Sequence, residues 1–187
     1  PFGVLCHEFG HHIGLPDLYD TSVSSNQSRV GEWDLMDYGA FVNDGDSPPH
    51  PSTWCKAYLS WTSPTTVTTA IELNISYFEG TSGNAFKIPI LGSTTEYFLV
   101  EYRKQTGADT YLPGQGVLIW HIDDTVGSVT ENNINNNQTH LRVALEEADK
   151  DSDVKDNKGE STDPFTAGNI FSSPYSDGYT DPSYITI

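Results

Sequence analysis

One stretch determines the structure that we expect at the start of the chain. It is His-Glu-Phe-Gly-His-His-Ile-Gly-Leu-Pro-Asp, at residues 7–17. On a helix, residues four apart leave the same face about 6 Å apart along the axis, so His7 and His11 can bind one Zn²⁺. Glu8 lies about 100° around the helix from His7, where its carboxylate can reach a water molecule on the metal rather than the metal. We therefore predict one helix that carries two zinc ligands and a general base.

A third ligand follows from the end of this helix. Gly14 can take a positive φ at no steric cost, and Pro16 cannot donate a backbone hydrogen bond to a continuing helix. The chain should reverse there and bring Asp17 beneath the two histidines, which leaves the fourth zinc position open. His12 is turned about 100° from His11, so we expect it to form a hydrogen bond behind the ligands or to meet solvent.

The apolar residues of the same helix form a stripe. Leu5, Phe9 and Ile13 repeat every four residues, roughly opposite the histidines. We predict that this stripe packs on a core while the histidines face a cleft. Two histidines at this spacing also occur in helices that bind no metal, but the glutamate, glycine and aspartate in this stretch favour the zinc site.

The sequence resembles the immune inhibitor A family of secreted bacterial zinc metallopeptidases. The resemblance starts in the run from His7 to Asp20 and includes five later segments, Gly31–Gly39, Ser52–Trp61, Gly116–Asp123, Glu147–Asp149 and Asp163–Phe165. It covers most of the chain, but only the first forty residues contain motifs specific enough to indicate a chemistry.

The resemblance implies a metzincin-like catalytic domain in which a methionine-bearing turn lies beneath the zinc. Met36 is the one methionine of the chain, and the resemblance makes it the hydrophobic floor of the site. Tyr38 lies two residues further on, at the spacing where a tyrosine can reach the metal or the oxyanion. A methionine that fills a gap in the core and an aromatic residue that packs in a loop are the structural alternatives.

These residues indicate peptide-bond hydrolysis of a protein or peptide substrate. Zinc held by His7, His11 and Asp17 would activate water, and Glu8 would take the proton of that water and deliver it to the leaving amine. Two alternatives stay open. One is a non-catalytic, metal-stabilised extracellular binding module derived from a peptidase, and the other is a zinc hydrolase that cuts a different bond.

Composition limits the partners. The 187 residues include 26 acidic and 9 basic side chains, which give a formal net charge of −17. This charge argues against nucleic acid and anionic membranes as partners, and it suits a secreted, extracellular protein or one that collects cations. No apolar run approaches the roughly 20 residues of a membrane span. Because the chain begins at Pro1, we expect a fragment that lacks the upstream half of the cleft, and nothing in the sequence indicates its oligomeric state.

The fold class expected is α+β. Residues 1–61 would form the C-terminal half of a metallopeptidase catalytic domain, with the zinc helix and methionine turn of a metzincin-like lower subdomain. Residues 62–187 would form an antiparallel, β-rich, sandwich-like region. Its expected strands are residues 66–76, 85–91, 97–103, 116–123 and 141–145. His121 lies in one of these strands, where we expect a structural role, and we expect residues 132–137 to form a solvated loop.

An acidic segment near residues 146–163 contains a possible calcium site. Five residues fall at positions one, three, five, nine and twelve of a calcium-loop template: Asp149, Asp151, Asp153, Asn157 and Glu160. Val154 stands where the template requires glycine, which argues against an EF-hand. A less regular calcium loop that also uses Asp163 and a merely solvated acidic loop both remain open.

The chain has two cysteines, Cys6 in the zinc helix and Cys55 in an expected second helix after Ser52. Either a disulfide between the two helices or two buried thiols is compatible with this arrangement. Cys6 is not expected to bind the metal, because it points about 100° away from His7.

Overall fold

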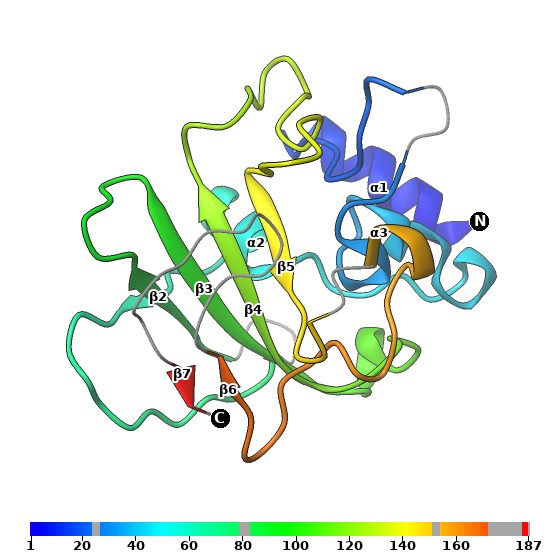
Figure 1. The fold of residues 1–187 in the computed structure, drawn as a ribbon. Helices are drawn as coiled ribbons and strands as arrows, with labels where there is room; N and C mark the ends of the chain where they lie inside the picture. The colour runs from blue at the N-terminus through cyan, green and yellow to red at the C-terminus, as the bar shows by residue number, and fades with distance from the viewer. Residues whose placement is uncertain (24–26, 79–82, 151–153, 172–184, 187) are drawn as a thin grey trace.

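The first element of the computed structural model is α1 (Phe2–His12), in a structure that describes residues 1–23, 27–78, 83–150, 154–171 and 185–186 (Figure 1). The helix stops where the sequence predicts. The amide of Ile13 donates to the carbonyl of Phe9, and Gly14 then takes a φ of +107°, in the left-handed region that favours glycine. The chain turns back from this point toward Asp17.

The orientation of α1 differs from the prediction. Its buried residues are Gly3, His7 and Gly10. Leu5 and Phe9 are 66% and 59% exposed, so the expected packing of the apolar stripe on a core is wrong. The two glycines explain the orientation, because a methyl group at Gly3 would overlap the carbonyl of Ala40. The histidine face therefore packs closely against the following segment, η2 (Tyr38–Gly45).

Two short helices complete the N-terminal part. The 3-10 turn η1 (Gly31–Trp33) precedes η2, and α2 (Thr53–Tyr58) follows it. The sequence predicts the start of α2 correctly, since the hydroxyl of Ser52 accepts a hydrogen bond from the amide of Cys55. Cys6 and Cys55 are free thiols. None of the described helices is long and apolar enough to cross a bilayer.

A single open sheet of five strands follows. In spatial order its strands are β1 (Thr65–Thr66), β2 (Ala85–Pro89), β3 (Glu96–Arg103), β4 (Gly116–Asp123) and β5 (Val143–Glu146). β2 to β5 pair antiparallel as predicted, whereas β1 pairs parallel with β2. The strand predicted at 66–76 is wrong beyond Thr66. After the Val67 amide donates to the Lys87 carbonyl, the chain forms no further ladder with β2.

The second sheet needed for a sandwich is missing from the described residues, which add only a two-stranded ribbon of β6 (Ile170–Phe171) and β7 (Ile185–Thr186). Phe171 packs against Phe98 on one face of the main sheet. The fold is therefore a mixed α+β arrangement in which helices precede an open, mostly antiparallel sheet. The two remaining elements are η3 (Gly107–Asp109) and α3 (Val154–Asn157).

The main core joins the N-terminal part to the sheet. Side chains of β4 alternate between the two faces, so that Leu118 and Trp120 point to one core and Ile119 points to the other. The first of these cores also contains Met36 and Trp54 from the N-terminal part. The zinc helix and its supporting turn are thereby fixed to one face of the sheet, and the domain division near residue 61 stays a prediction.

A buried ion pair strengthens this junction. Arg103 of β3 donates two hydrogen bonds of 2.8 Å to the carboxylate of Asp109 and a third, of 3.1 Å, to the carbonyl of Trp33. Neighbouring Glu101 accepts from the hydroxyl of Thr53 and from the indole of Trp120. Because all of these groups are buried, their hydrogen bonds hold the segment after η1 in one position against the sheet.

Candidate metal centre

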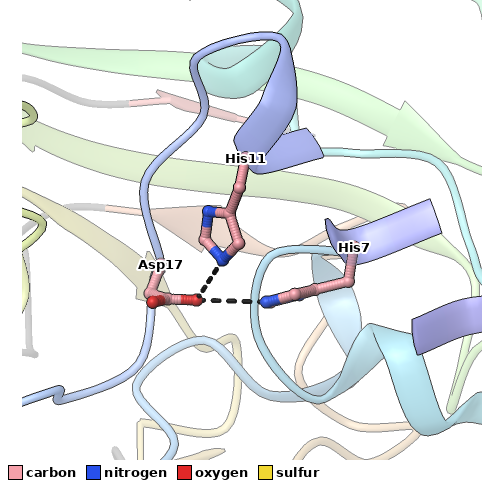
Figure 2. A group of neighbouring side chains, drawn as sticks. All are labelled: His7, His11 and Asp17. Carbon is pink, nitrogen blue, oxygen red and sulfur yellow. Dashed lines mark hydrogen bonds and ion pairs between the residues drawn. The ribbon is translucent and has the colours of Figure 1, made fainter. Parts of the chain in front are cut away.

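Three predicted ligands converge at the end of α1. The Nε2 atoms of His7 and His11 each lie 3.1 Å from the same carboxylate oxygen, Oδ1 of Asp17 (Figure 2). In a tetrahedral zinc site with bonds near 2 Å, neighbouring ligand atoms lie about 3.3 Å apart. The three side chains therefore fit one zinc ion, and they arrive by the local route that the sequence predicts.

The hydrogen bonds behind the two imidazoles fix their orientation. Nδ1 of His7 lies 2.9 Å from the carbonyl of Leu35, and Nδ1 of His11 lies 2.9 Å from the carbonyl of Leu15. A carbonyl can only accept, so each Nδ1 carries the proton and each neutral ring presents the lone pair of Nε2. This is the tautomer that a metal requires.

Asp17 is held by a residue far along the chain. Its amide donates to the side-chain oxygen of Asn132 at 2.6 Å, and the Asn132 amide group donates to Asp17 Oδ2 at 2.6 Å. Residues 132–137 form a loop as predicted, but the loop is not solvated throughout. Asn135 in the same loop is fully buried and donates to the carbonyls of Leu18 and Val143. Sequence reasoning missed Asn132 because nothing local to it marks a partner 115 residues away.

Met36 lies beneath the helix. It is fully buried, and a methyl group placed at Gly10 would come within 2.5 Å of the Met36 sulfur. Gly10 sits between the two histidines, so the methionine fills the space directly under the turn that carries them. The carbonyl of Met36 also accepts from the amide of Leu18, which ties the methionine turn to the chain just after Asp17.

Burial and charge act in opposite directions on the ligands. Burial disfavours the imidazolium of His7, but its contacts with Asp17 and with the Leu35 carbonyl outweigh burial and raise the pKa of His7. Burial would also raise the pKa of Asp17, yet hydrogen bonds from His7 and Asn132 and the nearby charge of His11 lower it. A cation in this position would replace the protons that the carboxylate attracts to the imidazoles.

A cavity of about 280 Å³ opens beside His7. Its lining residues are Val4, His7, Glu8, Tyr19, Asp37, Tyr38, Ala40 and Phe41. Glu8 and Tyr38, predicted respectively as base and transition-state donor, therefore line one cavity next to a ligand. Tyr38 is half-buried, and the ammonium group of Lys158 lies 4.1 Å from the centre of its ring.

Tyr19 also lines this cavity and was not predicted. Its ring stacks on the imidazole of His7, with centroids 6.2 Å apart and planes within 13°. Burial and the carboxylate of Asp17 raise its pKa well above the usual value, so the phenol keeps its proton at neutral pH. The only sequence signal was its position two residues after the third ligand.

The acidic segment forms a second cluster. Glu147, Asp149 and Asp163 place carboxylate oxygens within 4.8 Å of one another. Two residues considered as calcium ligands, Asp149 and Asp163, belong to this group, whereas Asp151 and Asp153 lie outside the described residues. Glu160 is exposed and contacts Asp163 through its backbone amide.

Asp163 carries the electrostatic strain of this cluster. Burial raises its pKa to about 6, and the charges of Asp149 and Glu160 add to the rise, against hydrogen bonds from Trp33 and from the Glu160 amide. The carboxylates of the cluster therefore repel one another in the absence of a cation.

Three further residues lie outside both clusters. His121 is fully buried in β4, with Nε2 3.4 Å from a carboxylate oxygen of Glu96, in keeping with a structural role. His12 is exposed, and Cys6 belongs to neither metal-competent group of described residues.

Comparison with known proteins agrees with this geometry. Residues 1–64 match the family model described as Immune inhibitor A peptidase M6, catalytic domain. The peptidase M6 resemblance is thus confirmed over that segment. A stretch of 59 residues is 39% identical to Pre-pro-metalloprotease PrtV of Vibrio cholerae serotype O1 and covers 30% of this chain. A stretch of 40 residues is 40% identical to Immune inhibitor A of Bacillus thuringiensis subsp. alesti and covers 21% of this chain.

The matched segments span only 6% of the length of either relative. The M6 similarity therefore bears on the first third of the chain, where the zinc helix, the methionine turn and the cavity are found.

Proposed function

We propose that this chain is part of a zinc-dependent endopeptidase whose metal centre is formed by His7, His11 and Asp17. The observation that carries this proposal is the convergence of both Nε2 atoms on one oxygen of Asp17, with each Nδ1 anchored to a backbone carbonyl. Two imidazoles and one carboxylate are a common donor set of catalytic zinc, which leaves a fourth position for water or substrate. The M6 similarity of residues 1–64 supports the same assignment.

Zinc in this position would polarise a scissile carbonyl and lower the pKa of water. Glu8 lines the cavity next to His7, and in the proposed mechanism its carboxylate accepts the proton of the attacking water and passes it to the leaving amine. Tyr38 lines the same cavity, and in the proposed mechanism its phenol would donate a hydrogen bond to the oxyanion that develops on the carbonyl. Met36 and Gly10 hold the histidine turn rigid, so the ligands need no rearrangement.

The proposed substrate is a protein or peptide, and the proposed location is extracellular. A formal net charge of −17 favours neither nucleic acid nor an anionic membrane as a partner. The family model matches residues 1–64, which include His7, His11 and Asp17, and one of the named relatives is described as a metalloprotease.

The test is hydrolysis of casein by the full-length protein that contains this chain, with zinc content measured in parallel. Glu8→Gln keeps the size of the side chain but removes the base, so we expect activity to fall about 10²- to 10⁴-fold with zinc retained. Tyr38→Phe should lower kcat less, with KM nearly unchanged.

Three results would contradict the proposal. They are a protein that binds no zinc, equal activity of Glu8→Gln and parent, and activity that survives removal of the metal by a chelator. Bound zinc without turnover on any protein substrate would favour the alternative of a non-catalytic binding module.

A further inference from the structure

The cluster of Glu147, Asp149 and Asp163 lies away from the zinc ligands and has no part in the proposed peptide hydrolysis. Glu147 and Asp163 are 2% and 0% exposed, whereas Asp149 is open to solvent. Three carboxylates gathered within 4.8 Å at a partly buried position repel one another, and a bound cation would offset that repulsion.

One oxygen of Asp163 makes the need for a cation specific. Oδ2 accepts hydrogen bonds from the indole of Trp33 at 2.8 Å and from the amide of Glu160 at 3.1 Å. Oδ1 is equally buried, yet the part of the chain that the structure describes offers it no hydrogen-bond partner. Buried carboxylate oxygens are normally satisfied, so an unpaired oxygen on a carboxylate of this cluster indicates a missing ligand.

The backbone holds these carboxylates in place. The amide of Ala148 donates to the carbonyl of Asp163 at 2.9 Å, which joins the chain after β5 to the later segment. Phe165 then forms a bridge with Val117 at the start of β4. Asp163 is thus fixed on both sides, and Glu147 directly follows the last residue of β5. A site whose ligands are held by such contacts requires little ordering when a cation binds.

We propose that Glu147, Asp149 and Asp163 bind one Ca²⁺, with Asp163 Oδ1 as a direct ligand and water in the remaining positions. The donors are all oxygen, which favours a hard cation over zinc. Opposite ligands in a calcium site lie about 5 Å apart, because each bond is about 2.3–2.6 Å long, and the cluster fits within that span. The ligand set differs from the linear calcium-loop template, since Glu147 precedes the template and Asp163 follows it.

This calcium would lie next to the segment that leads into the methionine turn. Asp163 accepts a hydrogen bond from the indole of Trp33. Gly159 packs against the same indole, because a methyl group at Gly159 would lie 2.7 Å from the indole nitrogen. Trp33 lies three residues before Met36 in the segment that supports the zinc helix. The cation therefore ties the acidic segment to the methionine turn, and its binding does not depend on whether the zinc centre hydrolyses peptides.

Terbium(III) is a suitable probe, because it occupies calcium sites and luminesces when a nearby indole is excited. With zinc already added to occupy the histidine cluster, we expect terbium to bind one strong site and Ca²⁺ to displace it. Asp149→Asn should weaken both ions about tenfold or more, since ligand charge sets calcium affinity. Asp149 is exposed, so this variant is expected to keep the fold. Asp163→Asn should have the same effect, and Ca²⁺ should raise the Tm of the parent but not of either variant.

Glu72→Gln is the matched control, because Glu72 is an exposed carboxylate that lies outside the cluster. It should leave the affinity for terbium and Ca²⁺ unchanged, and so should Glu8→Gln. The proposal is overturned if no saturable terbium site is found, or if Asp149→Asn and Asp163→Asn bind both ions as tightly as Glu72→Gln does. Loss of casein hydrolysis in Glu8→Gln with unchanged calcium binding would separate this site from the peptidase.

Discussion

The two candidate ion-binding clusters of this molecule contact the same short segment but are built differently. His7 binds the carbonyl of Leu35 through Nδ1, and Asp163 accepts from the indole of Trp33, two residues earlier. The first cluster takes all of its ligands from residues 7–17 and combines two nitrogens with one oxygen. The second takes its ligands from the two ends of a loop and contains oxygen only. Zinc suits the first donor set and calcium the second.

The spacing of the ligand atoms therefore has a different origin in the two clusters. In the histidine cluster, helix geometry fixes the spacing, and the rest of the fold only anchors rings that already point the right way. In the Asp163 cluster, the fold itself creates the spacing, through the bridge between Val117 and Phe165. If this is correct, changes in one cluster should leave the ion affinity of the other nearly unaltered.

The largest effect is expected from Asp17→Asn, measured as zinc affinity in competition with a chelating dye. Structural zinc sites bind with about 10–16 kcal/mol, which is about 3 kcal/mol for each of four ligands, so losing the anionic ligand should weaken zinc on the order of 100-fold. Asp163→Asn removes a carboxylate from the other cluster and serves as the control, with zinc affinity expected within about threefold of the parent. An equal loss of zinc affinity in both variants would show that the two clusters are coupled.

A smaller effect is expected from Asp37, a carboxylate in the same segment as Trp33 and Leu35. It is buried, and burial raises its pKa to about 6 although the amides of Arg29 and Val30 and the hydroxyl of Ser28 donate to it. The pKa is higher in the folded state than in the unfolded one. The stabilising contribution is therefore complete below about pH 4 and is lost as the pH rises through about 6, which amounts to about 2–3 kcal/mol.

Asp37→Asn should remove this decline, as measured by urea unfolding of zinc-free protein between pH 4 and 7. The difference between variant and parent isolates Asp37, because the histidines titrate identically in both. Asp163 provides a second case, because burial also raises its pKa to about 6. Added Ca²⁺ should abolish the decline due to Asp163 but not that due to Asp37. A parent-minus-variant difference that is constant with pH would refute the assignment to Asp37.

The sequence predicts the local half of this architecture well. Helical periodicity places His7 and His11 on one face, and Gly14 ends the helix where a positive φ is required. The four predicted strands from 85 onward are found because they are short runs rich in β-branched and aromatic residues, separated by segments that contain Gly, Pro and Asn. The start of α2 follows from the capping hydroxyl of Ser52. Each of these features depends on neighbours within a few residues.

The predictions that are wrong share one cause: the structure at those positions depends on residues far away in the sequence. The stripe of Leu5 and Phe9 has a normal amphipathic pattern, yet the close approach allowed by Gly3 and Gly10 turns the other face inward. A strand at 66–76 would need a neighbour that the fold provides only at Thr65 and Thr66. The linear calcium-loop template does not include Glu147, which pairing between separate segments brings close to Asp163.

Asn132 is the clearest case and gives the smallest of these effects. Its side chain forms two hydrogen bonds with Asp17. The side-chain oxygen of Asn132 accepts from the backbone amide of Asp17, and the side-chain nitrogen of Asn132 donates to Asp17 Oδ2. Asn132→Ala leaves all three zinc ligands in place but frees the carboxylate to rotate. Groups that orient ligands typically contribute 10- to 100-fold to metal affinity, and we expect the low end, about tenfold, because the helix still aligns both histidines.

The matched control is Asn137→Ala in the same loop, where the side chain of the exposed asparagine bonds only to the nearby Thr139 among the interactions described. Zinc affinity in the chelator competition should be unchanged in this variant. If Asn132→Ala also binds zinc like the parent, the local sequence alone suffices for the site. A loss as large as that of Asp17→Asn would instead mean that the distant loop, rather than the helix, sets the position of the third ligand.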